Sequence, residues 1–464
     1  MSRGSKVRKN SAGLVISVSG VRGIVGEGLT PEVALRFAQA FGTYTKGGKI
    51  VLARDPRPSG VFLKSAAIAG LLSTGCEVID LKIAATPTLA LATKELKAQG
   101  GLCITGSHNP AQWNALKFFT PEGIYLNRRE LEKLVAIYKE GNFLSAPWDA
   151  VKGVKVYRGA NRRHISKVLK VVDKKTIRKR RFRVAVDSCN SAGGSATLML
   201  LEELACRIEA LYCEPTGIFP HDPEPVAKNL GDISRLVKEK RCDVGFALDA
   251  DADRVAIISG EGKPLGEEYT LALAAAHILR KSPGPVVMNI SSSRMSEDVA
   301  RGLGLPAFRS SVSELRVVER MKEVGAVIGG EGNGGVIYPQ VHYARDGLIA
   351  IALILEYMAE SGKTISELAR ALPRYFMLKT KMKCSKGEAR KVLSFLKRQF
   401  KGERLDTSDG VRIDWQDEWV HIRKSGTEPV MRIITEARTK KRAQELNAEM
   451  QKIAKQTIDP HLIK

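Results

Sequence analysis

Short apolar segments alternate with amphipathic helical segments along most of this chain. In the first part, predicted helices separate four apolar runs that are typical of strands, at residues 14–18, 50–53, 77–81 and 101–104. The same alternation resumes at Arg183 and again near residue 268. A β-α-β-α rhythm favours a sheet with helices on both faces. The sequence therefore predicts three α/β units.

The C-terminal segment has a different pattern. From about residue 372, helices predicted at 386–400 and 439–456 flank several strands, which indicates an α+β unit. At 464 residues the chain is also too long for a single core. We predict four domains, three α/β and one α+β, with bounds at 1–152, 153–258, 259–371 and 372–464.

The composition is that of an ordinary globular protein, with 44% hydrophobic and 27% charged residues. No run of about 18 apolar residues occurs, so we expect no membrane span. The basic N-terminus lacks a following apolar region, so we expect no signal peptide. Seven scattered cysteines indicate reduced thiols rather than a disulfide framework. Together these features predict a cytoplasmic location.

The net charge of +24 is compatible with nucleic acid or with small anionic substrates. The densest basic cluster, at residues 174–183, precedes a predicted strand and is interpreted as a solvated linker face. Aromatic residues make up 6% of the chain and are not interleaved with the basic ones. This arrangement disfavours single-strand binding, and we expect no nucleic-acid partner.

One predicted strand leads into Thr105-Gly106-Ser107-His108-Asn109-Pro110. The turn residues present the Ser107 hydroxyl at the end of that strand. The sequence does not match a nucleophile elbow, and His108 is adjacent, which is poor geometry for the base of a Ser-His pair. An ordinary turn and a phosphoryl-carrying serine with cationic partners both remain open.

Asp249, Asp251 and Asp253, followed by Arg254, lie between two apolar runs. Three carboxylates this close repel one another, a cost that is tolerated where a hard divalent cation binds. The EF-hand spacing is absent. The pattern predicts a Mg²⁺ site with room for a phosphate oxygen, and a solvated acidic turn is the alternative.

The segment 329–335 contains a G-x-G-x-x-G match. An extended segment and a proline follow it instead of a helix, which excludes the dinucleotide-binding fingerprint. Glu331 and Asn333 suit recognition of sugar hydroxyls, although a plain glycine-rich turn would look similar.

A fourth loop, 423–429, carries Arg423, Ser425, Gly426 and Thr427, and Arg432 follows it. Hydroxyls, a glycine-permitted backbone nest and guanidinium groups together suit a phosphate dianion. A surface turn is the alternative.

Taken together, these four loops resemble those of the α-D-phosphohexomutase superfamily, over essentially the whole chain. The resemblance implies three related α/β domains, with mixed sheets flanked by helices, and a C-terminal α+β domain around a central cleft. It also implies that Ser107 is the phosphoserine, and that its phosphate holds one Mg²⁺ together with Asp249, Asp251 and Asp253.

Further roles follow from the resemblance. Arg22 and Lys117 match the family's first-loop arginine and the lysine after the serine motif, which makes them candidates for proton transfer. His108 is counted with them as a catalytic candidate and Arg254 as a substrate-binding one. Sugar hydroxyls would be bound by Glu331 and Asn333. The substrate phosphate would be bound by Arg423, Ser425, Gly426, Thr427 and Arg432.

Two departures from the family pattern stand out. The sugar loop ends Asn333-Gly334-Gly335, where many bacterial members have Ser-Gly-His. Ser313 stands where the family usually has glycine. The sugar loop, residues 330–335, resembles that of archaeal members described as phosphoglucosamine or phosphomannose/phosphoglucose mutases.

The implied reaction interconverts hexose 6-phosphate and hexose 1-phosphate of glucosamine, glucose or mannose. It would run through phosphoserine and a sugar 1,6-bisphosphate, which also serves as activator, and the partners would be small sugar phosphates. Whether the protein is a monomer or a homo-oligomer is left open.

Two other interpretations are weaker. A haloacid-dehalogenase-like phosphatase with Asp249 as nucleophile would leave Ser107 idle, and it expects Thr or Val where Asp253 stands. An RNA-binding protein would explain the charge but none of the loops.

Overall fold

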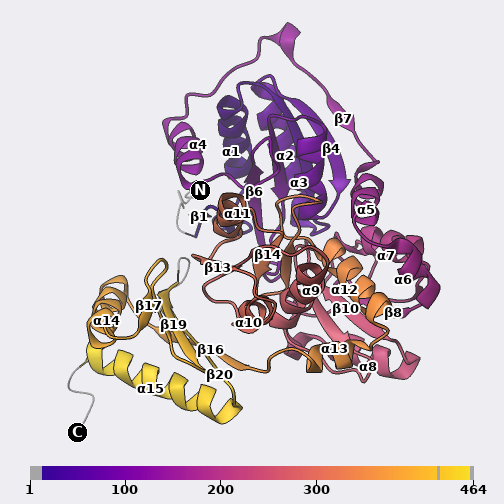
Figure 1. Ribbon diagram of the computed structural model, residues 1–464. Helices are drawn as coiled ribbons and strands as arrows, with labels where there is room; N and C mark the ends of the chain where they lie inside the picture. Colours follow the sequence, from indigo (N-terminus) through magenta and orange to yellow (C-terminus); the bar gives the residue numbers. More distant parts are fainter. Residues whose placement is uncertain (1–12, 426–428, 460–464) are drawn as a thin grey trace, which may run out of the picture. The chain divides into compact units, whose positions relative to one another are not determined.

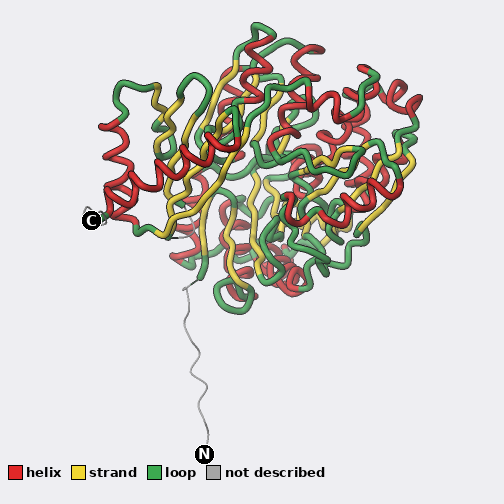
Figure 2. Tube along the Cα trace, turned by 90° about the horizontal axis from the view of Figure 1, so that it is seen from below, coloured by secondary structure: helices red, strands yellow, loops and turns green. Residues whose placement is uncertain are grey.

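The computed structural model describes residues 13–425 and 429–459, which form two compact units (Figure 1). The first unit runs to Thr270 and includes Gly334–Ser366. The second comprises Leu271–Asn333 and the chain from Glu367 onward. Figure 2, with helices in red and strands in yellow, shows helices packed on strands.

The first domain is built on a mixed sheet with the order β1-β2-β6-β5-β3-β4-β7. Its strands are β1 (Val15–Ser17), β2 (Gly20–Ile24), β3 (Lys49–Arg54), β4 (Glu77–Ile83), β5 (Gly100–Ile104), β6 (Trp113–Phe119) and β7 (Val154–Val156). β2 was not among the strands predicted from the sequence. Gly20 makes this strand possible, because its φ is +119° and a Cβ there would lie 2.6 Å from the Leu116 carbonyl oxygen.

Helices cover both faces of this sheet, as the alternation predicted. They are α1 (Pro31–Tyr44), α2 (Ser59–Ser73), α3 (Thr86–Glu95) and α4 (Arg128–Glu140). Thr30 caps α1 by accepting a hydrogen bond from the Val33 amide, and Pro31 is the first helical residue. Alternate β3 residues enter different cores: Leu52 packs with α1, α2 and α4, and Val51 packs with α3.

The second domain has the sheet order β11-β10-β8-β9. Its elements are α5 (Ala160–Lys170), α6 (Lys174–Arg180), β8 (Arg183–Asp187), α7 (Gly194–Glu203), β9 (Arg207–Leu211), α8 (Gly231–Lys240), β10 (Val244–Leu248) and β11 (Val255–Ser259). The basic cluster expected to be a linker face is mostly helix α6, capped by Asp173. The antiparallel pair β10–β11 is in register from Val244 to Leu248, so the aspartate loop closes a hairpin of two fully buried strands.

In the third domain, β13 (Ala307–Ser310) and β14 (Ile328–Glu331) both pair in parallel with β12 (Val286–Asn289). The other elements of this region are α9 (Glu268–Lys281), α10 (Met295–Gly302), α11 (Glu314–Val324), β15 (Gly335–Ile337), α12 (Gly347–Ser361) and α13 (Ile365–Arg370). Because the three strands are parallel, the loops that follow them emerge at one edge of the sheet. Functional loops gather at this edge in α/β folds.

The C-terminal domain is an antiparallel sheet with the order β16-β20-β19-β18-β17. Its elements are β16 (Phe376–Lys383), α14 (Lys386–Gln399), β17 (Arg404–Asp406), β18 (Val411–Asp414), β19 (Trp419–Lys424), β20 (Val430–Ala437) and α15 (Lys440–Ile458). Val392 of α14 and Leu446 of α15 pack with Ile433 of β20 in one buried core. The predicted fold class, three α/β domains and one α+β domain, is confirmed.

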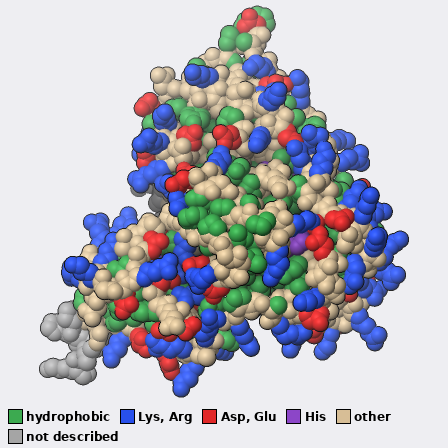
Figure 3. Space-filling model, in the orientation of Figure 1, with side chains coloured by type: hydrophobic (Ala, Val, Ile, Leu, Met, Phe, Trp, Pro, Cys, Tyr) green, Lys and Arg blue, Asp and Glu red, His purple; other side chains and the backbone are tan. Residues whose placement is uncertain are grey.

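Lys and Arg side chains are spread over the visible face and mixed with acidic ones (Figure 3). All seven cysteines are free thiols, five of them buried. Among the described residues, none of the helices has both the length and the apolar character needed to cross a bilayer.

Candidate active site

The Ser107 loop joins the buried strand β5 to β6. Ser107 has a φ of +50°, a left-handed conformation that is uncommon for a residue with a side chain, and it is 7% exposed. Thr105 stabilises this geometry: its Oγ1 accepts a hydrogen bond from the Ser107 amide (2.9 Å) and donates one to Asp55 Oδ2 (2.7 Å). The hydroxyl is therefore presented by a rigid, strained loop, as is common at functional sites.

The Arg57 side chain stabilises the same loop by hydrogen bonds to its backbone. This side chain is fully buried, and its Nε lies 2.9 Å from Asp55 Oδ2. Its two terminal nitrogens donate to the backbone carbonyls of Ser107, Asn109, Pro110 and Trp113. Sequence reasoning missed this role. Arg54, the other arginine of this segment, donates instead to the carbonyl of its neighbour Asp55 (2.8 Å). The available signal was a second arginine in the loop that follows β3.

Replacing Arg57 with lysine should therefore disorganise the Ser107 loop, because one ammonium cannot satisfy four carbonyls and a carboxylate. We expect turnover to fall about a hundredfold and the free energy of unfolding to fall by about 3 kcal/mol. Steady-state kinetics and urea denaturation measure the two effects. Arg54→Lys is the matched control and should cost less than about 1 kcal/mol. Equal losses in both variants would contradict the role given to Arg57.

The three predicted aspartates meet Ser107 in space. Asp249, Asp251 and Asp253 are fully buried, and one oxygen of each lies within 4.8 Å of the others. The Ser107 hydroxyl donates a hydrogen bond to Asp249 Oδ2 (3.0 Å), although 142 residues separate the two positions. The first two predicted motifs thus form one site.

Cationic and hydroxyl groups surround the carboxylates. Lys117, on β6 and 4% exposed, places Nζ 2.6 Å from Asp251 Oδ2. Thr86, at the start of α3, donates to the same oxygen (2.5 Å). Arg345 Nη2 lies 2.5 Å from Asp253 Oδ2, and Arg254 Nε lies 3.6 Å from Asp253 Oδ1. Sequence reasoning identified Lys117 and Arg254 but missed Thr86 and Arg345.

The pKa values of the buried carboxyls in this cluster are shifted in opposite directions. Burial and the facing charges of Asp253 and Asp251 raise the pKa of Asp249 well above its ordinary value. Burial also opposes ionisation of Asp251, but the Lys117 ammonium and the Thr86 and Ser107 hydroxyls outweigh it and lower the pKa of that carboxyl. Burial of Lys117 is likewise outweighed by Asp251, which raises the pKa of the ammonium. Asp251 and Asp253 thus each have a cationic partner, Lys117 and Arg345, whereas Asp249 has no ion-pair partner among the residues that the structure describes.

This donor set fits a hard divalent cation. Asp251 Oδ1 and Asp253 Oδ1 are buried and accept no hydrogen bond from any residue that the structure describes. Carboxylate oxygens are the ligands that Mg²⁺ prefers, usually together with phosphate oxygens. Asp249, Asp251, Asp253 and Ser107 are therefore the residues that could hold the ion.

His108 and Arg22 complete the group around the serine. His108 Nδ1 lies 3.3 Å from Ser107 Oγ. The Arg254 guanidinium, burial and Arg22 lower the pKa of His108 well below its ordinary value. Burial also lowers the pKa of Arg22. The nearby Arg254 lowers it further, and Asp251 partly opposes this shift. The serine hydroxyl thus faces a neutral imidazole and cationic side chains.

The remaining predicted residues belong to the second unit. Glu331 ends β14, is 5% exposed and accepts a hydrogen bond from Asn289 Nδ2 (2.8 Å). Asn333 is half-buried, and its Oδ1 has no hydrogen-bond partner in the part of the chain that the structure describes.

The phosphate-loop residues lie in the same unit. Arg423 and Arg432 are cross-strand partners in β19 and β20, and the Ser425 amide donates to the Val430 carbonyl (2.9 Å). Gly426 and Thr427 lie outside the described residues.

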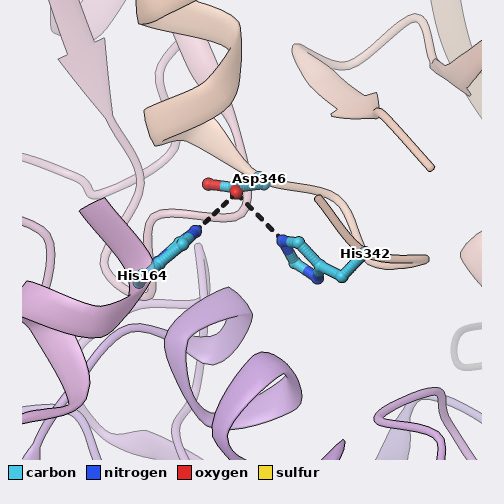
Figure 4. A group of neighbouring side chains, drawn as sticks. All are labelled: His164, His342 and Asp346. Atoms are coloured by element: carbon cyan, nitrogen blue, oxygen red, sulfur yellow. Dashed lines mark hydrogen bonds and ion pairs between the residues drawn. The ribbon is translucent and has the colours of Figure 1, made fainter. Parts of the chain in front are cut away.

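A buried His-Asp-His group, missed from the sequence, lies next to Arg345. The Nε2 atoms of His164 and His342 lie 2.7 and 2.9 Å from Asp346 Oδ2, and Figure 4 shows both rings pointing at this carboxylate. The other oxygen of Asp346 accepts the Leu348 amide (2.9 Å) and caps α12. These hydrogen bonds satisfy the carboxylate, so the group stabilises the segment that carries Arg345.

Asp346→Ala should lower the free energy of unfolding by about 3–5 kcal/mol, because it leaves two buried imidazoles and the N-terminus of α12 without their hydrogen-bond acceptor. Chemical denaturation measures the change. Asp149→Ala, at an exposed aspartate of the same unit, is the control. A loss below about 1 kcal/mol would show that the group contributes little.

Family models match the chain over four consecutive stretches. Residues 14–145, 162–262 and 266–376 match the alpha/beta/alpha domains I, II and III of phosphoglucomutase/phosphomannomutase. Residues 378–453 match the C-terminal domain of the same proteins.

Relatives match at full length. A phosphoglucomutase/phosphomannomutase of Thermococcus kodakarensis is 38% identical over 442 residues, covering 93% of this chain and 96% of that protein. A Thermococcus gammatolerans protein named "Probable phosphoglucosamine mutase" is 37% identical over 451 residues, 96% of this chain and 99% of the relative. The structure of a phosphoglucomutase/phosphomannomutase family protein from Burkholderia thailandensis has a TM-score of 0.84 at 25% identity, covering 96% and 99% of the two chains.

Fold, site and relatives define an isomerase of the phosphotransferase type. The chain belongs to the phosphoglucomutase/phosphomannomutase family, within the α-D-phosphohexomutase superfamily. The phosphatase alternative is not favoured, since the whole chain matches the mutase family.

Proposed function

We propose that this enzyme interconverts hexose 6-phosphate and hexose 1-phosphate through phosphorylated Ser107 and a hexose 1,6-bisphosphate. The observation that carries the proposal is the hydrogen bond from the Ser107 hydroxyl to Asp249 inside the buried carboxylate cluster. A serine in such a place has the surroundings that a phosphoryl carrier needs, namely cationic side chains and carboxylates suited to a divalent ion.

Each half-reaction exchanges one bond to phosphorus for another. First the bond between phosphorus and Ser107 Oγ breaks while one forms to the free hydroxyl oxygen of the sugar monophosphate. The sugar hydroxyl loses its proton and Ser107 Oγ gains one. The bisphosphate then presents its other phosphoryl group, which returns to Ser107 by the same exchange in reverse.

The chain's own residues prepare this transfer electrostatically. Held by Asp249, Asp251 and Asp253, a Mg²⁺ ion would supply positive charge beside the phosphoryl oxygens. Lys117 neutralises Asp251, and Arg22 and Arg254 add positive charge around Ser107. The neutral His108 can accept or donate a hydrogen bond beside the hydroxyl without adding charge.

We assign substrate binding to the loops of the second unit. A sugar phosphate carries about −1.5 to −2 charges, which suits Arg423, Arg432 and the hydroxyl and amide groups of Ser425, Gly426 and Thr427. Glu331 and Asn333 offer oxygen acceptors for sugar hydroxyls. Because relatives are named both as phosphoglucosamine mutase and as phosphoglucomutase/phosphomannomutase, glucosamine, glucose and mannose phosphates are the substrates to compare.

The test is intact-mass analysis of the purified protein after incubation with glucose 1,6-bisphosphate and Mg²⁺. We expect a gain of one phosphoryl group that peptide mapping assigns to Ser107, followed by its transfer to an added hexose monophosphate. A competition assay with the three 1-phosphates then identifies the preferred hexose. Release of inorganic phosphate with no phosphoserine would instead support a phosphatase with Asp249 as nucleophile.

A further inference from the structure

Within the second unit, the C-terminal domain contacts the loops that follow β12 and β13. Asn289, the last residue of β12, connects the sugar loop at Glu331 to the loop that follows β12. Its Nδ2 donates to Glu331 Oε1 (2.8 Å), and its Oδ1 accepts the Ser291 amide (2.9 Å). Ser292 adds a second tie, because its hydroxyl donates to Asn289 Oδ1 (3.1 Å) and accepts the Gly332 amide (2.9 Å). The sugar loop is thus held by the segment that begins at Asn289.

His421 of β19 continues this chain of hydrogen bonds into the C-terminal domain. It is fully buried, with Nδ1 2.8 Å from Ser291 Oγ and Nε2 2.6 Å from the Asp409 carbonyl oxygen. A carbonyl can only accept, so Nε2 carries the proton and Nδ1 accepts from the Ser291 hydroxyl. Burial, Arg412 and Arg423 lower the pKa of His421 to about 3, which keeps this single tautomer at neutral pH.

Asp409 carries the connection to the phosphate loop. Its Oδ2 accepts from Arg423 Nη2 (2.9 Å) and from the Val312 amide in the loop after β13 (3.3 Å). The neighbouring Gly410 has a φ of +84°, and a Cβ there would lie 2.3 Å from the Ile422 carbonyl oxygen, so the turn is pressed against β19. Arg423 Nε is buried and has no hydrogen-bond partner among residues 13–425 and 429–459. Holding Nη2 therefore leaves Nε available to another acceptor.

We propose that Ser291, His421 and Asp409 are positioning residues that couple the sugar loop at Glu331 to the phosphate-binding Arg423. Every link in this path is a buried or half-buried hydrogen bond or ion pair. The hydrogen bonds of such a network strengthen one another when every polar group in it has a partner. The path keeps the hydroxyl-binding and phosphate-binding groups at a fixed spacing. A sugar phosphate can then contact Glu331 with its hydroxyls and Arg423 with its phosphate at the same time. The inference rests on the proposed roles of Glu331 and Arg423.

A double-mutant cycle tests the coupling directly. Glu331→Gln and Arg423→Lys are made singly and together, and KM for the preferred hexose phosphate is measured for each. We expect the combined effect to differ from the product of the single effects by about fivefold. In a Ser291→Ala background, which removes the hydroxyl bonded to His421, this difference should shrink to about twofold or less.

Two further variants separate positioning from general destabilisation. Ser296→Ala, at a buried serine on α10 that is not part of the path, should leave the cycle as in the wild type. Asp409→Asn should raise KM more than it lowers kcat, because it weakens the hold on the phosphate-binding Arg423 and leaves every residue of the carboxylate cluster in place. Thermal unfolding of each variant reports whether the fold is retained.

The possible results are distinct. If the single variants raise KM but their coupling is equal in both serine backgrounds, the inference is overturned while the proposed function stands. If neither single variant changes KM, the assignment of Glu331 and Arg423 fails and the inference fails with it. Loss of coupling in Ser296→Ala as well as in Ser291→Ala would also overturn it.

Discussion

Replacing Ser107 with alanine is expected to lower mutase turnover by about 10³-fold or more. The variant lacks the oxygen that carries the phosphoryl group, so no other side chain can complete the double transfer. The fold should be retained, because the lost contacts are hydrogen bonds to Asp249 (3.0 Å) and His108 (3.3 Å). We expect a change in stability of about 1 kcal/mol.

Turnover is measured with a coupled assay, and phosphorylation by intact mass after incubation with the bisphosphate. The matched control is Ser65→Ala, an exposed serine on α2 of the same domain, which should behave as the wild type. Near-normal turnover in Ser107→Ala, or an unchanged phosphoprotein yield, would falsify the proposed mechanism.

Asp249→Asn is expected to change activity and stability in opposite directions. Turnover should fall about a hundredfold or more, because the site loses one of its three carboxylates for a divalent ion. Burial and the neighbouring aspartates raise the pKa of Asp249 in the folded state. An acid with a raised pKa lowers stability at every pH above its unfolded pKa. Removing this charge should therefore raise the free energy of unfolding at neutral pH by about 1 kcal/mol when a chelator is present.

Thermal unfolding with and without Mg²⁺ measures the second effect. In the chelator the variant should melt at a higher temperature than the wild type. Added Mg²⁺ should stabilise the wild type and leave the variant nearly unchanged, since a ligand stabilises the state that binds it. Asp243→Asn, at an exposed aspartate of the same domain, controls for a general charge effect. A variant that melts lower in the chelator would show that the carboxylate is already compensated without an ion.

The class of the fold could be predicted because strand and helix alternation is a local property of the sequence. The long apolar strands β3, β5 and β10 were all expected. Two of the strands that were missed carry weak patterns: β7 is exposed along its whole length, and β13 is half-buried throughout. Such short edge or half-buried strands exist because a neighbouring strand pairs with them, and the sequence of the segment itself does not reveal the neighbour.

The candidate site was predictable to a similar degree and for the same reason. Ser107 and the three aspartates stand in turns directly after apolar strands, where turn chemistry and like-charge crowding are visible locally. Thr86 and Arg345 have no such signature, and the local sign of Arg57 is only that it is a second arginine in the loop after β3. Arg57 serves the loop 50 residues away at Ser107, and Thr86 bonds to Asp251 across 165 residues.

The sequence by itself determined the alternation that makes three α/β layers and an α+β domain, and the four loops that carry reactive groups. Local residue type and spacing suffice for these features. Only the tertiary structure decided which of those groups meet, which arginine holds the serine loop, and which carboxyl is paired and which is not. These properties depend on burial and on charges brought together from distant parts of the chain, because removal from water is what gives a single ion pair or an unpaired carboxyl its large effect.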